Sequence, residues 1–303
     1  MSRIRTRLTV ALAASAVTAL ALAGCASSDP LTGGGESSAA PASDTITIGS
    51  QAYYSNEIIA EIYAQALEGA GFTVDRQFNI GQRDAYIPSL EDGSIQLFPE
   101  YTGNLLQFFD PETTATTSDD VYAALKDALP EGLTVLDQSS ATDQDSYNVT
   151  AAFAAENNLK SIADLAGVSG LVLGGAPELE ERPYGPTGLK DTYGVDVTFS
   201  GTADTTVDEL VAGNIQIANV YSADPRIKTD DLVTLEDPKG LFLASNVVPV
   251  VSTSVSGEIA DVINAVSAAL TPEGLVALNV QSTVDQTSPQ DIAKEWLAAN
   301  DLS

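Results

Sequence analysis

The stretch TITIGSQAYYSNEIIAEIYAQALEGAGFTVDRQF, residues 45–78, decides the fold class of this chain. Residues 45–48 are β-branched, as is typical of a strand, and residues 56–70 carry apolar side chains at helical spacing, with Gly71 placed as a C-terminal cap. A further strand pattern follows at residues 72–78. A strand, a helix and a second strand in this order form the repeating unit of a mainly parallel sheet covered by helices. The stretch therefore predicts an α/β protein.

The same alternation continues along the chain. A helix is predicted at residues 84–91 and a strand at 95–98, and the pattern resumes after residue 145. There it predicts strands at residues 149–153, 171–173, 195–199, 215–221 and 247–251, with helices at 161–165, 188–193 and 206–212. Three further helices are predicted at residues 258–270, 273–280 and 289–299. Two series of this size are enough for two α/β lobes, each with its own core.

The N-terminus has the layout of a secretory signal. Three arginines and no acid stand in the first seven residues, and residues 8–22 are apolar apart from three hydroxyl side chains, which is short for a membrane span. The run ends in Ala-Gly-Cys25, which resembles the bacterial lipobox, in which the cysteine is acylated. The alternative is an ordinary secretory signal with a chance cysteine. We expect a signal peptide over residues 1–24, lipid on Cys25 and a flexible, Ser- and Gly-rich linker over residues 25–44, so that the protein is anchored to the cell membrane outside the cytoplasm.

The composition excludes several classes of function. The formal net charge is -29, and removal of residues 1–24 with their three arginines makes it -32 (-29 minus 3), so nucleic acid is not an expected partner. Histidine is absent and Cys25 is the only cysteine, which excludes Ser-His-Asp and Cys-His catalysis and the usual zinc sites. Carboxylate-only chemistry and a calcium site stay open. We expect no metal site and no cofactor.

Seven segments, in order along the chain, resemble the substrate-binding proteins of ABC importers for glycine betaine, choline and related osmoprotectants. They are residues 48–51 (IGSQ), 99–103 (PEYTG), 145–147 (DSY), 178–188, 221–224 (YSAD), 235–239 (LEDPK) and 246–251 (NVVPVV). The resemblance implies the two-lobed α/β fold of type II periplasmic binding proteins, with two crossover segments and a ligand held between lobes that close about a hinge. Lobe one would span residues 45–144 plus 248–303, and lobe two residues 145–247.

The resemblance also implies a site for a quaternary ammonium group. Such a group has no hydrogen-bond donor, so the faces of aromatic rings recognise it. In this family an aromatic cage surrounds the ammonium, and its positions fall on Tyr101, Tyr147 and Tyr221, whereas a fourth falls on Ser245 and leaves one wall open. For any single tyrosine, the alternative is a core side chain with a satisfied hydroxyl. Three more tyrosines are candidates for the open wall: Tyr53, Tyr54 and Tyr184.

The polar end of such a ligand needs other residues. The resemblance implies that Arg182 binds the carboxylate of a betaine, a task that suits a planar guanidinium, and the alternative is a surface ion pair with a neighbouring glutamate. Gln51 and Asn104 are uncharged candidates, so both choline and a betaine stay open. Thr102 and Asn104 lie near an expected helix start, where free backbone N–H groups favour an anion.

The sequence thus predicts a lipid-anchored, monomeric binding protein and not an enzyme. It would capture glycine betaine, choline or a related quaternary amine for an ABC permease driven by an ATPase. A first alternative is a binding protein for a different small solute, because Ser245 opens the cage. Two others are an extracellular glycan hydrolase with two facing carboxylates in a cleft and an adhesion protein without a cleft.

Overall fold

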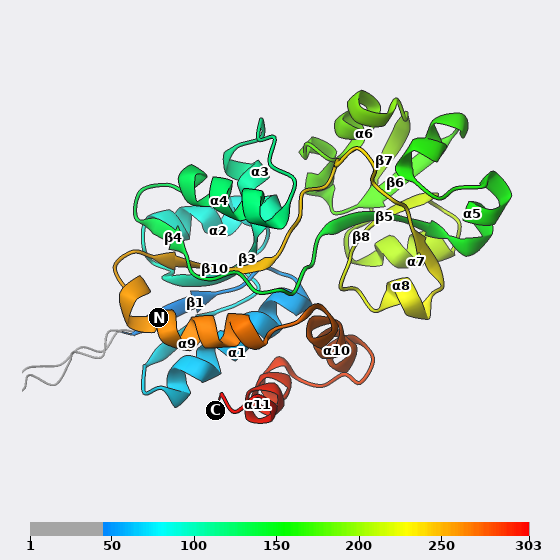
Figure 1. Ribbon diagram of the computed structural model, residues 1–303. Coiled ribbons are helices and arrows are strands. Elements are labelled where there is room, and N and C mark those ends of the chain that lie inside the picture. The colour runs from blue at the N-terminus through cyan, green and yellow to red at the C-terminus, as the bar shows by residue number, and fades with distance from the viewer. Residues whose placement is uncertain (1–44, 303) are drawn as a thin grey trace, which may run out of the picture. The chain divides into compact units, whose positions relative to one another are not determined.

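The computed structural model describes residues 45–302. The predicted signal peptide, the lipid on Cys25 and the linker up to residue 44 lie outside the described residues. Residues 43–303 form one compact unit that contains two five-stranded sheets, each flanked by helices (Figure 1). The predicted α/β fold class is confirmed.

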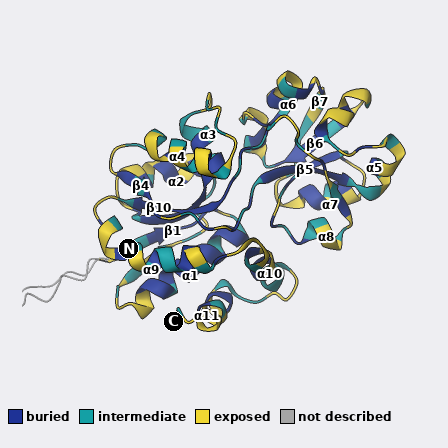
Figure 2. Ribbon diagram, viewed as in Figure 1, coloured by how far each residue is buried: buried dark blue, intermediate teal, exposed yellow. Residues whose placement is uncertain are grey.

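The first sheet has the strand order β2-β1-β3-β10-β4. Its strands are β1 (Ile46–Gly49), β2 (Val74–Gln77), β3 (Leu97–Tyr101), β4 (Leu133–Val135) and β10 (Val247–Ser252). Its helices are α1 (Tyr54–Gly69), α2 (Arg83–Glu91), α3 (Thr102–Phe109), α4 (Ser118–Ala128), α9 (Ser256–Ala269), α10 (Pro272–Thr283) and α11 (Pro289–Ala299). Leu97 and Tyr101 of β3 belong to the core shared with α1, α9, α10 and α11, and Phe98 belongs to the core under α2, α3 and α4. The central strands β1, β3 and β10 are therefore buried on both faces, whereas the edge strand β2 is partly exposed, and the buried strands are dark in Figure 2.

The second sheet has the order β7-β6-β8-β5-β9. Its strands are β5 (Asp145–Thr150), β6 (Leu171–Gly175), β7 (Val197–Gly201), β8 (Ile217–Tyr221) and β9 (Leu232–Thr234). Its helices are α5 (Ala151–Asn157), α6 (Pro186–Tyr193), α7 (Thr206–Val211) and α8 (Arg226–Thr229), with 3₁₀ turns η1 (Ile162–Gly167), η2 (Pro177–Glu181) and η3 (Ala203–Thr205). Alternate residues of β8 again serve two cores, because Ile217 packs with one and Ala218 with the other.

The prediction of mainly parallel sheets is corrected by the strand pairing. Each sheet has two parallel and two antiparallel pairings, and the antiparallel strand is β10 in the first and β5 in the second. Both strands directly follow segments that connect the two sheets, and these segments lie side by side. Thr142 bridges Asn246, and the N–H of Asp143 donates to the carbonyl of Ser245 at 3.1 Å. The local patterns of β5 and β10 could not show this direction, because it depends on where the chain crosses.

Several predicted elements differ in extent or type. The strand expected at residues 149–153 ends at Thr150, because the Thr150 hydroxyl accepts the N–H of Phe153 at 3.2 Å and starts α5. The helix expected at residues 161–165 is the 3₁₀ turn η1. Helix α3 begins at the expected helix start, whereas helices α4, α5 and α8 and strands β4 and β9 were not predicted.

Within residues 45–302 no single helix is both long enough and apolar enough to cross a membrane. Only α9 and α10 taken together reach that length and hydropathy, and they are bent by 88° to each other.

Candidate functional site

Three tyrosines line a cleft of about 730 Å³. Tyr53 precedes α1, Tyr54 begins it, and Tyr221 ends β8 of the other sheet. The ring centroid of Tyr53 lies 4.8 Å from that of Tyr54 and 4.9 Å from that of Tyr221. The start of α1 and the end of β8 thus contribute one continuous aromatic surface to the cleft wall.

Tyr101 lies behind this surface and carries a buried hydroxyl. Its side chain is 5% exposed, and among the described residues its Oη has no hydrogen-bond partner, as is also true of the Tyr54 hydroxyl and the Gln51 side-chain amide nitrogen. Burial raises the pKa of Tyr101, and the neighbouring charge of Asp143 raises it further. An unpaired buried polar group costs roughly 1–3 kcal/mol, a cost that a hydrogen bond to a ligand would offset. We call Tyr53, Tyr54, Tyr101 and Tyr221 the cleft tyrosines. Tyr101 is not among the described residues that line the cleft, so its contact with a ligand stays a prediction.

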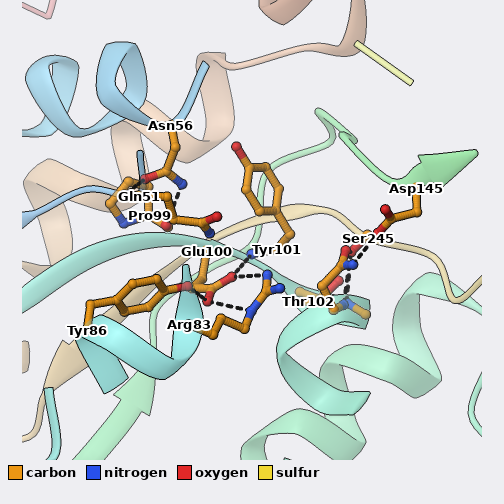
Figure 3. Close-up of polar contacts among 12 residues, drawn as sticks. Gln51, Asn56, Arg83, Tyr86, Pro99, Glu100, Tyr101, Thr102, Asp145 and Ser245 are labelled. Carbon is orange, nitrogen blue, oxygen red and sulfur yellow. Dashed lines mark hydrogen bonds and ion pairs between the residues drawn. The ribbon is translucent and has the colours of Figure 1, made fainter. Parts of the chain in front are cut away.

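A buried ion pair supports Tyr101 from the sheet side. Glu100 is fully buried and accepts from Arg83 at 2.9 and 2.7 Å, from the Tyr86 hydroxyl and from the Tyr101 N–H at 2.9 Å. Figure 3 shows the Tyr101 hydroxyl pointing away from this group. The sequence analysis missed it, although a glutamate in the otherwise apolar strand Leu97–Tyr101 indicates a buried partner.

Asp143 is a second buried acid that the sequence analysis did not assign to the site. It is 1% exposed, and its two carboxylate oxygens accept from the Tyr53 hydroxyl and from the N–H of Ala223, both at 3.0 Å. Burial raises the pKa of Asp143 to about 7, and the charges of Asp145 and Asp224 contribute to the rise. Asp143 therefore connects the start of α1 to the end of β8 within the aromatic surface.

The predicted polar residues gather at the start of α3. The Ser245 hydroxyl accepts the N–H groups of Gly103 and Asn104 at 3.1 and 3.2 Å and donates to the Asn104 side-chain oxygen at 2.7 Å. The Thr102 hydroxyl accepts the N–H of Asn246 at 3.0 Å. The expectation that N–H groups near Thr102 and Asn104 are free for an anion is therefore wrong. The Asn246 carbonyl accepts the N–H of Thr102 at 2.9 Å, and the Ser245 hydroxyl accepts that of Asn104.

Asn104 also reaches the second sheet. Its side-chain nitrogen donates to the Asp145 carboxylate and to the Tyr184 hydroxyl, the latter at 3.1 Å. In Figure 3, Asp145 lies near Ser245 at the start of α3. Arg182 lies across from the same region, where its guanidinium is 3.7 Å from Asp84 and 5.9 Å from the ring centre of Phe108. The salt bridge of Arg182 is thus with α2, and not with a neighbouring glutamate.

Tyr147 occupies a different environment from the cleft tyrosines. It is fully buried, its hydroxyl donates to the backbone carbonyl of Tyr184, and its ring centroid lies 5.0 Å from that of Phe242. Tyr147 is not among the described residues that line the cleft, so its contact with a ligand stays a prediction. We call Tyr147, Tyr184 and Phe242 the core aromatic group.

This arrangement suits the binding of an organic cation through ring faces. Three tyrosines meet at the cleft wall, and a fourth places an unpaired hydroxyl behind it. Within residues 45–302 no group of three His, Cys, Asp or Glu side chains is arranged to hold a metal ion.

Comparison with known proteins gives consistent matches. The family model described as the substrate-binding domain of ABC-type glycine betaine transport systems matches residues 44–299. The glycine betaine-binding protein YehZ of Escherichia coli K12 is 25% identical over 277 residues, covering 84% of this chain and 90% of that protein. A glycine-betaine-binding protein of Pseudomonas aeruginosa PAO1 is 25% identical over 284 residues, covering 86% and 89%. The crystal structure of a glycine betaine/carnitine/choline ABC transporter protein has a TM-score of 0.70 at 22% identity, covering 85% of this chain and 99% of that chain, which is a likeness of fold.

Proposed function

Because the chain belongs to the family of substrate-binding domains of ABC-type glycine betaine transport systems, we propose that it captures glycine betaine, choline or a related quaternary amine for an ABC permease. Proteins of this family bind substrates and are not enzymes, so the glycan hydrolase is not favoured. The adhesion protein is not favoured for the same reason.

The cleft tyrosines are the observation that supports the substrate class. A trimethylammonium group offers no N–H, and each aromatic face contributes about 0.5–2 kcal/mol to holding it. Tyr53, Tyr54 and Tyr221 present such faces at the cleft, and Tyr101 adds a buried hydroxyl beside them. A neutral or sugar-like ligand would leave this aromatic surface without its electrostatic partner.

We assign the residues of the site as follows. Tyr101 and Tyr221 keep the roles that the family resemblance implied, and Tyr53 and Tyr54 take the place of the tyrosine that Ser245 replaces. The polar end of the ligand would face Gln51, Asn104 and Arg182, with Thr102 and Ser245 holding the start of α3. Tyr147 stays a predicted contact.

The lobes and the anchor are further parts of the proposal. Lobe one would comprise residues 45–144 plus 248–303 and lobe two residues 145–247, a division supported by the membership of the two sheets. Lipid on Cys25 would hold the monomeric protein on the outer face of the cell membrane, next to the permease and its ATPase. The arginine-rich, apolar N-terminus supports this placement.

A thermal-shift series on the purified full-length protein tests the substrate class. Glycine betaine, choline, carnitine and proline betaine are compared with ectoine, proline and a sugar. A ligand at about 100 times its Kd adds roughly 2.7 kcal/mol, which raises Tm by several degrees. We expect such shifts for quaternary amines alone. A shift only with ectoine, proline or the sugar would show that the substrate is of another class.

A further inference from the structure

Asp143 is a buried acid that forms no ion pair among the described residues. Its hydrogen bonds come from a tyrosine hydroxyl and a backbone N–H, which are neutral donors. Among the described residues Arg83 is the one buried arginine, and its guanidinium donates to both carboxylate oxygens of Glu100. A buried carboxylate without a cation is expensive, so this position favours the arrival of a positive charge.

Tyr53 contacts this carboxylate directly, and the other three cleft tyrosines lie close enough to be influenced by its charge. Burial raises the pKa of all four phenols, and the charge of Asp143 adds to the rise at each of them. Asp143 is bonded to Tyr53, and the Tyr53 ring contacts the rings of Tyr54 and Tyr221 at the cleft wall. A cation lying on these rings would therefore be separated from the carboxylate by one phenol. At such a distance, in surroundings of intermediate dielectric, the attraction is still substantial.

We propose that Asp143 is a specificity-determining residue that acts through Tyr53 as the counter-charge of the ligand, so that the site selects ligands by their positive charge and not by their shape alone. The inference rests on the proposed function, since it concerns the same cleft. It adds a requirement that ring faces do not impose by themselves, because an aromatic cage also packs well against a neutral tert-butyl group of the same size.

The counter-charge couples binding to pH. The groups that face Asp143 are Tyr53 and Tyr54 at the start of α1, Tyr101 of β3, Asp145 of β5, and Tyr221 and Asp224 at the end of β8. With a pKa of about 7, Asp143 is partly protonated in the free protein at neutral pH, and a bound cation favours its ionised form. The proton leaves to the solvent. Affinity for a cation should therefore rise with pH, by about tenfold between pH 6 and pH 8.

Calorimetric titration with a pair of isosteres tests the inference. The ligands are choline and 3,3-dimethyl-1-butanol, which has the shape of choline without its charge. The proteins are the wild type, Asp143→Asn and the control Asp127→Asn, all full-length, at pH 6 and pH 8. Asp127 is an exposed residue of α4, so its variant makes the same change in net charge outside the cleft.

The wild type and the control should bind choline about tenfold more tightly at pH 8 than at pH 6, and the butanol equally at both. In Asp143→Asn the pH effect on choline should disappear and its preference over the butanol should fall about tenfold. If binding of the butanol is too weak to detect, the inference is judged by the pH dependence of the choline affinity alone.

Choline binding that is independent of pH in the wild type would overturn the inference while leaving the proposed function in place. An unchanged choline preference in Asp143→Asn would do the same. If neither choline nor glycine betaine binds the wild type, the proposed function fails and the inference fails with it. Should Asp143→Asn not fold, the wild-type pH profile with the two isosteres still decides.

Discussion

The molecule holds two groups of aromatic side chains that differ in how their hydroxyls are used. In the core aromatic group the hydroxyl of Tyr147 donates to a backbone carbonyl, and that of Tyr184 accepts from Asn104. Among the cleft tyrosines, within the described residues, the hydroxyls of Tyr54 and Tyr101 have no partner. A satisfied group stabilises the fold, whereas an unsatisfied one beside a cleft keeps its interactions for a ligand.

The charges around the two groups differ as well. Among the cleft tyrosines, Tyr53 donates to the carboxylate of Asp143, and the N–H of Tyr101 donates to Glu100, which is paired with Arg83. Tyrosines that look equivalent in the sequence thus differ in role, and the polar groups around each tyrosine distinguish a core side chain from a ligand-binding one. The following predictions test that distinction.

The largest effect is expected from the ion pair that supports Tyr101. Glu100→Gln leaves the buried guanidinium of Arg83 without its counter-charge and should lower the free energy of unfolding by about 3–5 kcal/mol, measured by urea denaturation. Glu68→Gln is the matched control, because Glu68 pairs with Arg76 at a side chain that is 42% exposed, and it should cost at most about 1 kcal/mol. Equal losses in the two variants would show that burial does not set the strength of the Glu100 pair.

The pH dependence of stability should reveal Asp143. Its folded pKa of about 7 lies above the unfolded value of about 3.9, so the folded protein holds the proton more tightly and loses stability as pH rises between these values. From pH 5 to pH 8 this contribution should fall by about 2–3 kcal/mol. We expect urea denaturation of the ligand-free protein to show this decline in the wild type relative to Asp143→Asn. Parallel pH profiles for the two proteins would contradict it.

Removal of single hydroxyls compares the two aromatic groups directly. Tyr147→Phe leaves the carbonyl of Tyr184 without its donor and should cost about 1–3 kcal/mol of unfolding free energy. Tyr101→Phe removes a hydroxyl that has no partner among the described residues and should change stability by at most about 0.5 kcal/mol. The comparison is broken if Tyr101→Phe is the more damaging change.

The affinity for choline, unlike the stability of the fold, should depend on the cleft tyrosines. Tyr221→Ala removes a cleft ring and should weaken choline binding by about 0.5–2 kcal/mol, measured by calorimetric titration. Tyr122→Ala, on α4 and outside the cleft, should leave the affinity unchanged. Equal affinities for Tyr221→Ala and the wild type would remove Tyr221 from the site.

Much of the fold was predictable, because local periodicity determines strands and helices. The antiparallel direction of β5 and β10 could not be predicted, because it depends on two segments about 100 residues apart that pair at Thr142 and Asn246. The cleft positions of Tyr53, Tyr54 and Tyr221 followed from candidates that the sequence offered.

The rest of the site depends on contacts that local patterns do not contain. The surroundings of Tyr147 are set by Phe242 and Tyr184, which come from other parts of the chain. Asp143 is buried by partners 90 residues before it and 80 residues after it, Tyr53 and Ala223. Nothing near Asp143 in the sequence distinguishes it from a solvent-exposed acid.

A crystal structure of the protein with choline bound tests the central claim most directly. We predict that the trimethylammonium group lies within about 6 Å of the ring centroids of Tyr53, Tyr54 and Tyr221. In the core aromatic group, the Tyr147 hydroxyl should still donate to the carbonyl of Tyr184, and the Tyr184 hydroxyl should still accept from Asn104. A trimethylammonium group bound instead against Tyr147 and Tyr184, away from the cleft tyrosines, would contradict the account.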